Sequence, residues 1–125
     1  MNVVDSSAWL EYFADGPNAE EFASAIQDAA NLIVPSITLF EVFKRIRVQR
    51  DSEIALRAVS QMRRGTVVDL DADLAVAAAD LSADLKMALA DSVILATAQA
   101  YAATVWTQDA DFEGLDNVEY RVHRA

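Results

Sequence analysis

Short runs of β-branched residues alternate with helical stretches from one end of this chain to the other. The pattern predicts an α/β fold in which a central, mostly parallel sheet is covered by helices. We expect strands at 2–5, 32–34, 66–69 and 104–107, with a weak fifth at 118–122, and helices at 6–13, 19–29, 36–49, 51–63, 71–85 and 91–103. No repeat, linker or low-complexity tract interrupts the alternation, so residues 1–125 are expected to form a single domain.

The residues at the segment boundaries support this assignment. Asp5 or Ser6 should cap the first helix, and Pro35 should stop the second strand, with Ser36 capping the helix that follows. Gly65 should end the helix at 51–63. The stretch 91–103 is apolar nearly all round, which predicts a central, buried helix.

Composition excludes several classes of site. The chain has no Cys, so it has no disulfide framework, zinc ribbon or thiol nucleophile. The N-terminus lacks the basic flank and long apolar core of a secretory signal, and no apolar run reaches about 18 residues. We therefore expect a cytoplasmic protein that does not contact a membrane. The lone His123 is expected to be a solvated residue of the tail rather than a catalytic base.

Charge is distributed unevenly along the chain. The net charge of −10 argues against a general polyanion binder. Seven of the ten Lys and Arg residues nevertheless lie between 44 and 64: Lys44, Arg45, Arg47, Arg50, Arg57, Arg63 and Arg64. This basic segment is either two solvated helix faces or a surface that meets a phosphate backbone or an acidic partner.

Acidic residues lie at the ends of two of the expected strands and open one of the expected helices. Asp5 closes the first strand, Asp91 opens the apolar helix, and Asp109 follows the strand at 104–107. The carboxyl ends of parallel strands share one edge of a sheet, so these acids can converge there. Converging carboxylates repel each other, and a hard divalent cation such as Mg²⁺ is the simplest way to keep them ionised.

Each acid also has a purely structural interpretation. Asp5 and Asp91 could be helix caps, and Glu41 could form a surface pair with Lys44 or Arg45. Asp109 and Asp111 could begin a short helical turn, although their spacing also suits shared metal coordination.

The combination of segments is more specific than its parts. Four segments carry it: Val-Val-Asp-Ser-Ser (3–7), Val-Pro-Ser-Ile-Thr-Leu-Phe-Glu-Val (34–42), Ala-Leu-Ala-Asp-Ser-Val-Ile-Leu-Ala-Thr-Ala (88–98) and Val-Trp-Thr-Gln-Asp-Ala-Asp-Phe (105–112). Together they resemble the PIN-domain family, and within it the VapC-type toxin ribonucleases of type II toxin–antitoxin systems. The resemblance implies a three-layer α/β/α fold and an Mg²⁺- or Mn²⁺-dependent endoribonuclease. It also implies a cognate VapB-like antitoxin and a homodimer.

The resemblance assigns roles to individual positions. Asp5, Glu41, Asp91 and Asp109 match the catalytic acidic quartet, of which Asp5, Asp91 and Asp109 are the expected metal ligands. Ser7 and Thr107 match supporting polar positions, and Asp111 could share or replace the role of Asp109. Two positions depart from the family pattern: Ala88 stands where Pro is common, and Gln108 where Arg is frequent.

The expected metal-dependent chemistry indicates an RNA substrate, and it leaves one alternative function open. Single-stranded or loop RNA suits an open sheet-edge site, and Arg45, Arg47 and Arg50 could face either the RNA or the antitoxin. Apolar residues near the acids, such as Trp9 and Phe40, suggest a symmetric dimer interface. The main rival is a catalytically inactive PIN-like binding module that acts through an antitoxin–operator complex.

Two other enzyme classes fit less well. Residues 67–71 superficially match the Asp-x-Asp start of haloacid-dehalogenase-like phosphatases, but that motif should open the domain and be followed by a Gly-Thr turn. A response-regulator receiver domain would need a Lys near its last strand, and no Lys follows Lys86.

Overall fold

The computed structural model describes residues 1–124. Within them, five strands form one parallel sheet in the order β3-β2-β1-β4-β5. The strands are β1 (Asn2–Val4), β2 (Leu32–Pro35), β3 (Thr66–Val68), β4 (Thr104–Thr107) and β5 (Val118–Tyr120). The predicted α/β class is confirmed, and the sheet, expected to be mostly parallel, is parallel at every strand pair described.

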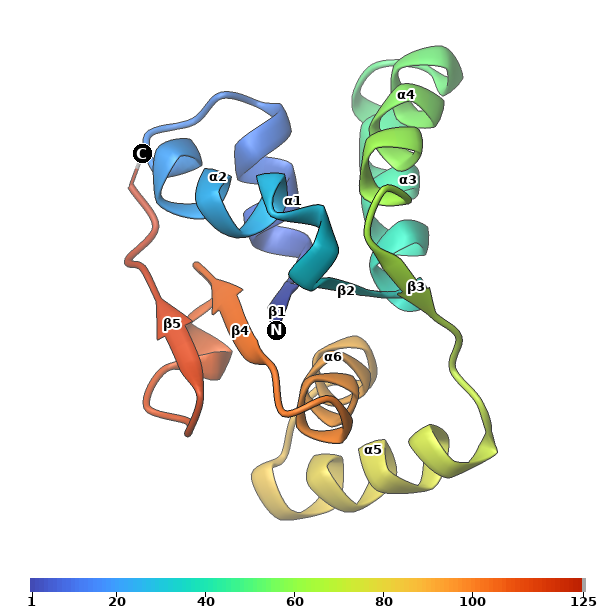
Figure 1. Cartoon of the computed structure of the whole chain (residues 1–125), viewed down its shortest axis with the longest axis vertical. Helices are drawn as coiled ribbons and strands as arrows, with labels where there is room; N and C mark the ends of the chain where they lie inside the picture. The colour runs from blue at the N-terminus through green and yellow to red at the C-terminus, as the bar shows by residue number, and fades with distance from the viewer. Residues whose placement is uncertain (125) are drawn as a thin grey trace.

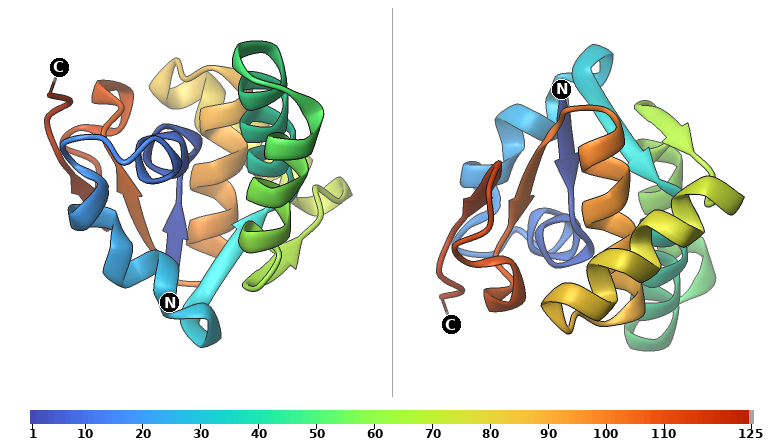
Figure 2. Two further views of the ribbon diagram at one scale, coloured as in Figure 1. Left: turned by 90° about the horizontal axis from the view of Figure 1, so that it is seen from above. Right: turned by 90° about the horizontal axis from the view of Figure 1, so that it is seen from below.

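Helices cover both faces of the sheet, which gives the predicted three layers (Figures 1 and 2). One side carries α1 (Ser6–Phe13), α2 (Ala19–Gln27), α3 (Ser36–Gln49) and α4 (Ser52–Met62), and the other carries α5 (Ala72–Leu85) and α6 (Leu89–Ala100). Two short 3₁₀ turns, η1 (Ala29–Asn31) and η2 (Ala110–Phe112), precede β2 and follow β4. No helix among the described residues is both long and apolar enough to cross a membrane.

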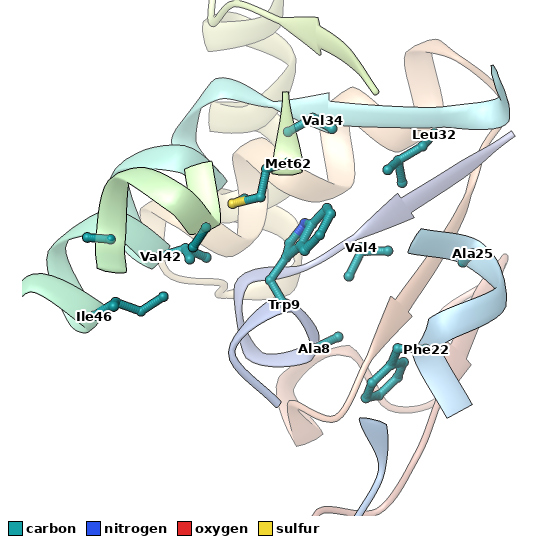
Figure 3. Close-up of a cluster of buried hydrophobic side chains, with 12 residues drawn as sticks. Val4, Ala8, Trp9, Phe22, Ala25, Leu32, Val34, Val42, Ile46 and Met62 are labelled. Carbon is teal, nitrogen blue, oxygen red and sulfur yellow. The ribbon is translucent and has the colours of Figure 1, made fainter. Parts of the chain in front are cut away.

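Alternating strand residues build the two cores. Val4 and Val34 pack on the α1–α4 side, where Figure 3 shows Trp9 between Val4 and Met62 of α4. Val3 and Val105 point to the opposite side and join the apolar face of α6. Successive strand side chains face opposite sides, so a sheet buried on both faces needs apolar residues at consecutive positions.

Some boundaries differ from those expected from the sequence. Pro35 is still paired in the sheet and is itself the N-cap residue of α3, so Ser36 is the first helical residue rather than the cap. Helix α6 begins at Leu89, two residues earlier than expected, with Ala88 as its N-cap residue. Asp91 therefore lies in the first turn of α6 and is not its cap.

The chain order creates a switch point beside β1. The chain passes from β1 to β2 and β3 on one side, and then returns to place β4 on the other side of β1. Ligands of open α/β sheets bind outside the carboxyl ends of the strands at such a point. Here those ends are Asp5 after β1 and residues 108–109 after β4, and the Asp5 N–H donates to the Trp106 carbonyl at 3.0 Å.

Candidate functional site

Asp5 is a buried carboxylate held by three hydrogen bonds. Its Oδ1 accepts from the Ala8 N–H at 3.0 Å and from Ser7 Oγ at 2.8 Å, and its Oδ2 accepts from Thr107 Oγ1 at 2.7 Å. Burial raises the pKa of Asp5 from 3.8 to about 6, although these hydrogen bonds act in the opposite direction. Asp5 thus caps α1 and also presents a fixed carboxylate at the switch point.

Thr107 and Ser7 connect the ends of β1 and β4. Thr107 is fully buried, and its Oγ1 donates to Asp5 while accepting from the Asp109 N–H at 2.9 Å. Ser7 Oγ accepts from the Gln108 N–H at 3.3 Å. The two residues that the sequence placed in supporting roles therefore fix the position of Asp5 relative to the segment that carries Asp109.

Asp91 extends from the first turn of α6 toward the other acids. Its pKa is raised from 3.8 to about 7, first by burial and then by the charges of Asp109, Asp5, Asp111 and Glu41, in that order of size. The four predicted catalytic acids therefore share one electrostatic environment, and Asp111 belongs to it as well.

Asp91, Asp109 and Asp111 form the tightest acidic group. One carboxylate oxygen from each lies within 4.8 Å of the others. Asp109 Oδ1 also accepts from the Asp111 N–H at 2.9 Å, which starts the η2 turn. The structure thus brings the expected ligands Asp91 and Asp109 together with Asp111, while Asp5 stands beside this group rather than in it.

Glu41 is held by a partner that the sequence did not indicate. Ser6 Oγ donates to Glu41 Oε1 at 2.6 Å, so the residue before Ser7 orients the acid on α3. Among residues 1–124, Glu41 forms no ion pair with Lys44 or Arg45, and Lys44 Nζ instead lies 5.8 Å from the centre of the Phe40 ring. The surface pair considered for Glu41 is absent from this part of the chain.

The four predicted catalytic acids, without Asp111, line one cavity, which we call the acidic cavity. It has a volume of about 480 Å³. Its lining includes Asp5, Glu41, Asp91, Asp109, Ser6, Ser7, Lys44 and Arg45. Lys44, which the sequence did not single out for the site, lines it together with Arg45. The cavity therefore combines carboxylates that can hold a cation with cationic side chains that attract a polyanion.

The three arginines considered for RNA or antitoxin contacts do not share one surface. Arg45 lines the acidic cavity and also an adjoining one, in which it is joined by Arg50. Arg47 lines an apolar groove between α3 and α4, together with Phe43 and Val59, and this groove adjoins the acidic cavity at Phe40 and Lys44. The helical repeat separates Arg45 from Arg47, because residues two apart point in directions about 200° apart, whereas Arg50 lies after α3 as its C-cap residue.

Asn18 is a site-supporting residue that sequence reasoning missed. It is buried, and its Nδ2 donates to Gln108 Oε1 at 3.0 Å and to the Val122 carbonyl at 2.9 Å. Its Oδ1 accepts from Arg124 Nε at 2.8 Å. Asn18 therefore ties the residue next to Asp109 to the C-terminal segment. A turn-forming Asn in the sequence gives no sign of contacts about a hundred residues away.

A Thr107→Val substitution tests the connection between the strand ends. Valine keeps the shape but leaves Asp5 Oδ2 without a donor and the Asp109 N–H without an acceptor. We expect the free energy of unfolding to fall by about 1–3 kcal/mol, and the catalytic activity of this acidic site to fall about 10- to 100-fold. Thr107→Ser should restore most of both. Thr104→Val, at the start of the same strand, is the control; an equal effect there would show that β4 is generally sensitive to this change.

The chain matches a family model and several solved structures. The model of the PIN domain matches residues 3–118. A toxin–antitoxin complex from Klebsiella pneumoniae contains a chain with 21% identity and a TM-score of 0.80, and the match covers 95% of this chain and 96% of that one. The sarcin–ricin loop cleaving toxin VapC20 of Mycobacterium tuberculosis has 15% identity and a TM-score of 0.78, with 93% and 95% covered.

A third structure, VapBC2 from Rickettsia felis bound to a DNA fragment from its promoter, has 16% identity and a TM-score of 0.74, with 95% and 97% covered. At these identities the structural matches establish the fold. No curated protein matches the chain in sequence. Since the family model spans nearly all of the described residues, the chain belongs to the PIN domain family, a family of nucleases.

Proposed function

We propose that this protein is the toxin of a toxin–antitoxin pair and a metal-dependent endoribonuclease that hydrolyses RNA phosphodiester bonds. The observation that carries the proposal is the convergence of Asp5, Glu41, Asp91, Asp109 and Asp111 at the switch point of a PIN domain. Raised pKa values at Asp5 and Asp91 show that the folded chain resists full ionisation of this cluster. A site whose carboxylates repel one another is suited to a bound cation, because the cation offsets their negative charge.

The donor set fits Mg²⁺ or Mn²⁺. Carboxylate oxygens are the hard ligands that these ions prefer, and Asp91, Asp109 and Asp111 offer three within 4.8 Å. Among residues 1–124 no ion pair neutralises any of them. We propose Asp91 and Asp109 as ligands, with Asp5 and Asp111 completing the site. A bound ion would activate water and offset the negative charge of the reacting phosphate.

The chain's own residues then have distinct tasks. Asp5, held by Ser7 and Thr107, keeps a carboxylate at a fixed position in the lining of the acidic cavity. Glu41, oriented by Ser6, is placed to accept a proton or to orient the attacking water. Lys44 and Arg45 line the same cavity and would attract the RNA backbone.

An RNA cleavage assay tests the proposal. End-labelled single-stranded RNA is incubated with the protein and Mn²⁺, then with excess EDTA. We expect cleavage with the ion and none with EDTA. Absence of cleavage on a broad panel of tRNA, rRNA and mRNA fragments, together with tight binding of the neighbouring gene product and of operator DNA by the complex, would favour the inactive binding module instead.

The antitoxin is proposed as the protein partner. The solved structures from Klebsiella pneumoniae and Rickettsia felis are toxin–antitoxin or VapBC assemblies. On this chain, the groove between α3 and α4 combines exposed Phe40 with Arg47 and Arg63, which suits an amphipathic segment that carries acids. We therefore assign Arg47 to the antitoxin side, and Arg45 and Arg50 to the RNA side.

Charge substitutions separate these two roles. Arg45→Ala combined with Arg50→Ala should weaken RNA binding and reduce the slope of log K against log salt by about two. Arg47→Ala should leave that slope unchanged and loosen the antitoxin complex. Arg64→Ala, an exposed residue after α4, is the charge-matched control. An unchanged slope in the double variant would remove Arg45 and Arg50 from the RNA path.

A homodimer remains a prediction, and the structure reduces the number of apolar residues that could form its interface. Trp9 is 1% exposed and belongs to the core, so its side chain cannot contribute to a dimer interface. Phe40 is 62% exposed, but it lies in the groove already assigned to the antitoxin, so it does not specifically support a dimer. Sedimentation at tens of micromolar should show a dimer; a monomer at that concentration contradicts the prediction.

A further inference from the structure

We propose that a second cavity, beside the acidic one, binds one unpaired nucleobase of the RNA next to the cleaved bond. This side cavity has a volume of about 520 Å³. Ser7, Leu10, Arg45 and Asp109 line both cavities, so the two are contiguous. The inference rests on the proposed RNA hydrolysis, because a strand whose phosphate lies over the acids would place a neighbouring nucleotide at this shared wall.

The apolar part of the side cavity suits the face of a base. Leu10, Phe13, Ile46 and Ile54 contribute to its lining. The Phe13 ring stacks on the buried Trp9 ring, with centroids 5.6 Å apart and planes at 18°, so the aromatic wall is rigid. Unpaired RNA bases are commonly held by stacking on aromatic and apolar side chains.

The polar part suits the edge of a base rather than a phosphate. Glu11 is 8% exposed, and its Oε2 accepts from the Asn18 N–H at 2.8 Å, so a negative charge lies in the lining. This carboxylate disfavours an anion deep in the cavity and favours a base with an exocyclic amino group. Gln108 Oε1 is occupied by Asn18 Nδ2, which leaves its amide N–H groups to donate, and the exposed Gln49 adds a second amide.

Cationic residues contribute to the exposed part of the same lining. Arg45 and Arg50 are exposed and line the side cavity together with Gln49. They can pair with backbone phosphates while the base lies inside against Phe13 and Glu11. The cavity thus separates the two parts of a nucleotide by charge, and we expect it to prefer adenosine, cytidine or guanosine over uridine.

Direct binding tests the side cavity without relying on catalysis. ¹⁵N-labelled protein with Mg²⁺ is titrated with AMP, CMP, GMP, UMP and ribose 5-phosphate. We expect the side-chain amide signals of Gln49 and Gln108 to shift and saturate with the amino-bearing nucleotides, and less with UMP. No shift with any nucleotide, or an equal shift with ribose 5-phosphate, would overturn the assignment, the latter because it indicates a phosphate site.

A cleavage experiment then measures the contribution of the base. Each nucleoside flanking the cut in a cleaved oligoribonucleotide is replaced in turn by an abasic residue. At one position we expect kcat/KM to fall about tenfold. The ratio between intact and abasic substrate should shrink in Gln49→Ala and persist in Gln61→Ala, an exposed control on α4.

The two experiments distinguish failure of the nuclease proposal from failure of the base-site proposal. Nucleotide binding without RNA cleavage would reject the nuclease and retain the base site. Cleavage with no abasic position costing more than twofold would reject the base site and retain the nuclease. If Gln49→Ala leaves the ratio intact but loosens the antitoxin complex, the side cavity belongs to the protein partner, and the proposal is wrong.

Discussion

Asp91→Asn is expected to abolish RNA cleavage while making the metal-free protein more stable at pH 8. Asp91 has a pKa of about 7 because it is partly buried and faces Asp109, Asp5, Asp111 and Glu41. Asparagine removes the charge that these four carboxylates oppose, so the folded state without metal gains about 1 kcal/mol once solvent screening is allowed for. The same change removes a proposed ligand, so cleavage should fall on the order of a thousandfold.

Thermal unfolding in EDTA and RNA cleavage with Mn²⁺ measure the two effects on one variant. Asp84→Asn, an exposed residue near the end of α5, is the matched control and should change neither. Near-normal cleavage by Asp91→Asn would remove this residue from the catalytic group. A loss of stability in EDTA would instead show that its carboxylate makes a favourable contact that outweighs the repulsion.

Asp5→Asn is expected to abolish RNA cleavage as Asp91→Asn does, but to stabilise the metal-free protein less. Asp5 accepts hydrogen bonds from Ala8, Ser7 and Thr107, and an amide can accept at only one of its two atoms. Relief of charge and loss of a hydrogen bond therefore oppose each other at Asp5. This contrast distinguishes Asp5, whose carboxylate accepts hydrogen bonds from the fold, from Asp91, whose charged form is opposed by burial and by the neighbouring acids.

The layers of the fold and the edge that carries the acids could be predicted from the sequence. Consecutive apolar residues such as Val3 and Val4 identify strands buried on both faces, and Asp5 after them gives both a helix cap and a carboxylate at the sheet edge. These are local patterns, because strand period, cap chemistry and the alternation of strands with helices involve residues close in sequence. They are sufficient to place the acids at strand ends in an α/β sheet.

The finer contacts of the site depend on how distant elements pack, and local patterns do not contain them. The Ser6–Glu41 bond joins α1 to α3, and the Asn18–Gln108 bond joins residues 90 positions apart. For the same reason the sequence left open whether Asp111 shares or replaces the role of Asp109, and the structure places both beside Asp91.

The metal-free protein should be more stable at pH 5 than at pH 8, and a divalent cation should reverse this order. The pKa values of Asp5 and Asp91 are raised from 3.8 to about 6 and about 7. Between about pH 4 and pH 7 the folded chain therefore binds more protons than the unfolded chain, so the free energy of unfolding falls as pH rises through this window. At pH 8 both groups are ionised and the repulsion is complete.

Added Mg²⁺ or Mn²⁺ should raise the unfolding temperature at pH 8 and have little effect at pH 5, because protons compete for the same oxygens. An ion at a hundredfold excess over its Kd contributes about 2.7 kcal/mol, or several degrees in a domain of this size. Unfolding temperatures measured in EDTA and in millimolar Mn²⁺ at pH 5, 6, 7 and 8 provide the check, with Asp91→Asn expected to flatten both profiles. If the protein without metal is instead most stable at pH 8 and the ion acts equally at every pH, the acidic cavity is not a site strained by its own charge, and the proposed metal site loses its physical basis.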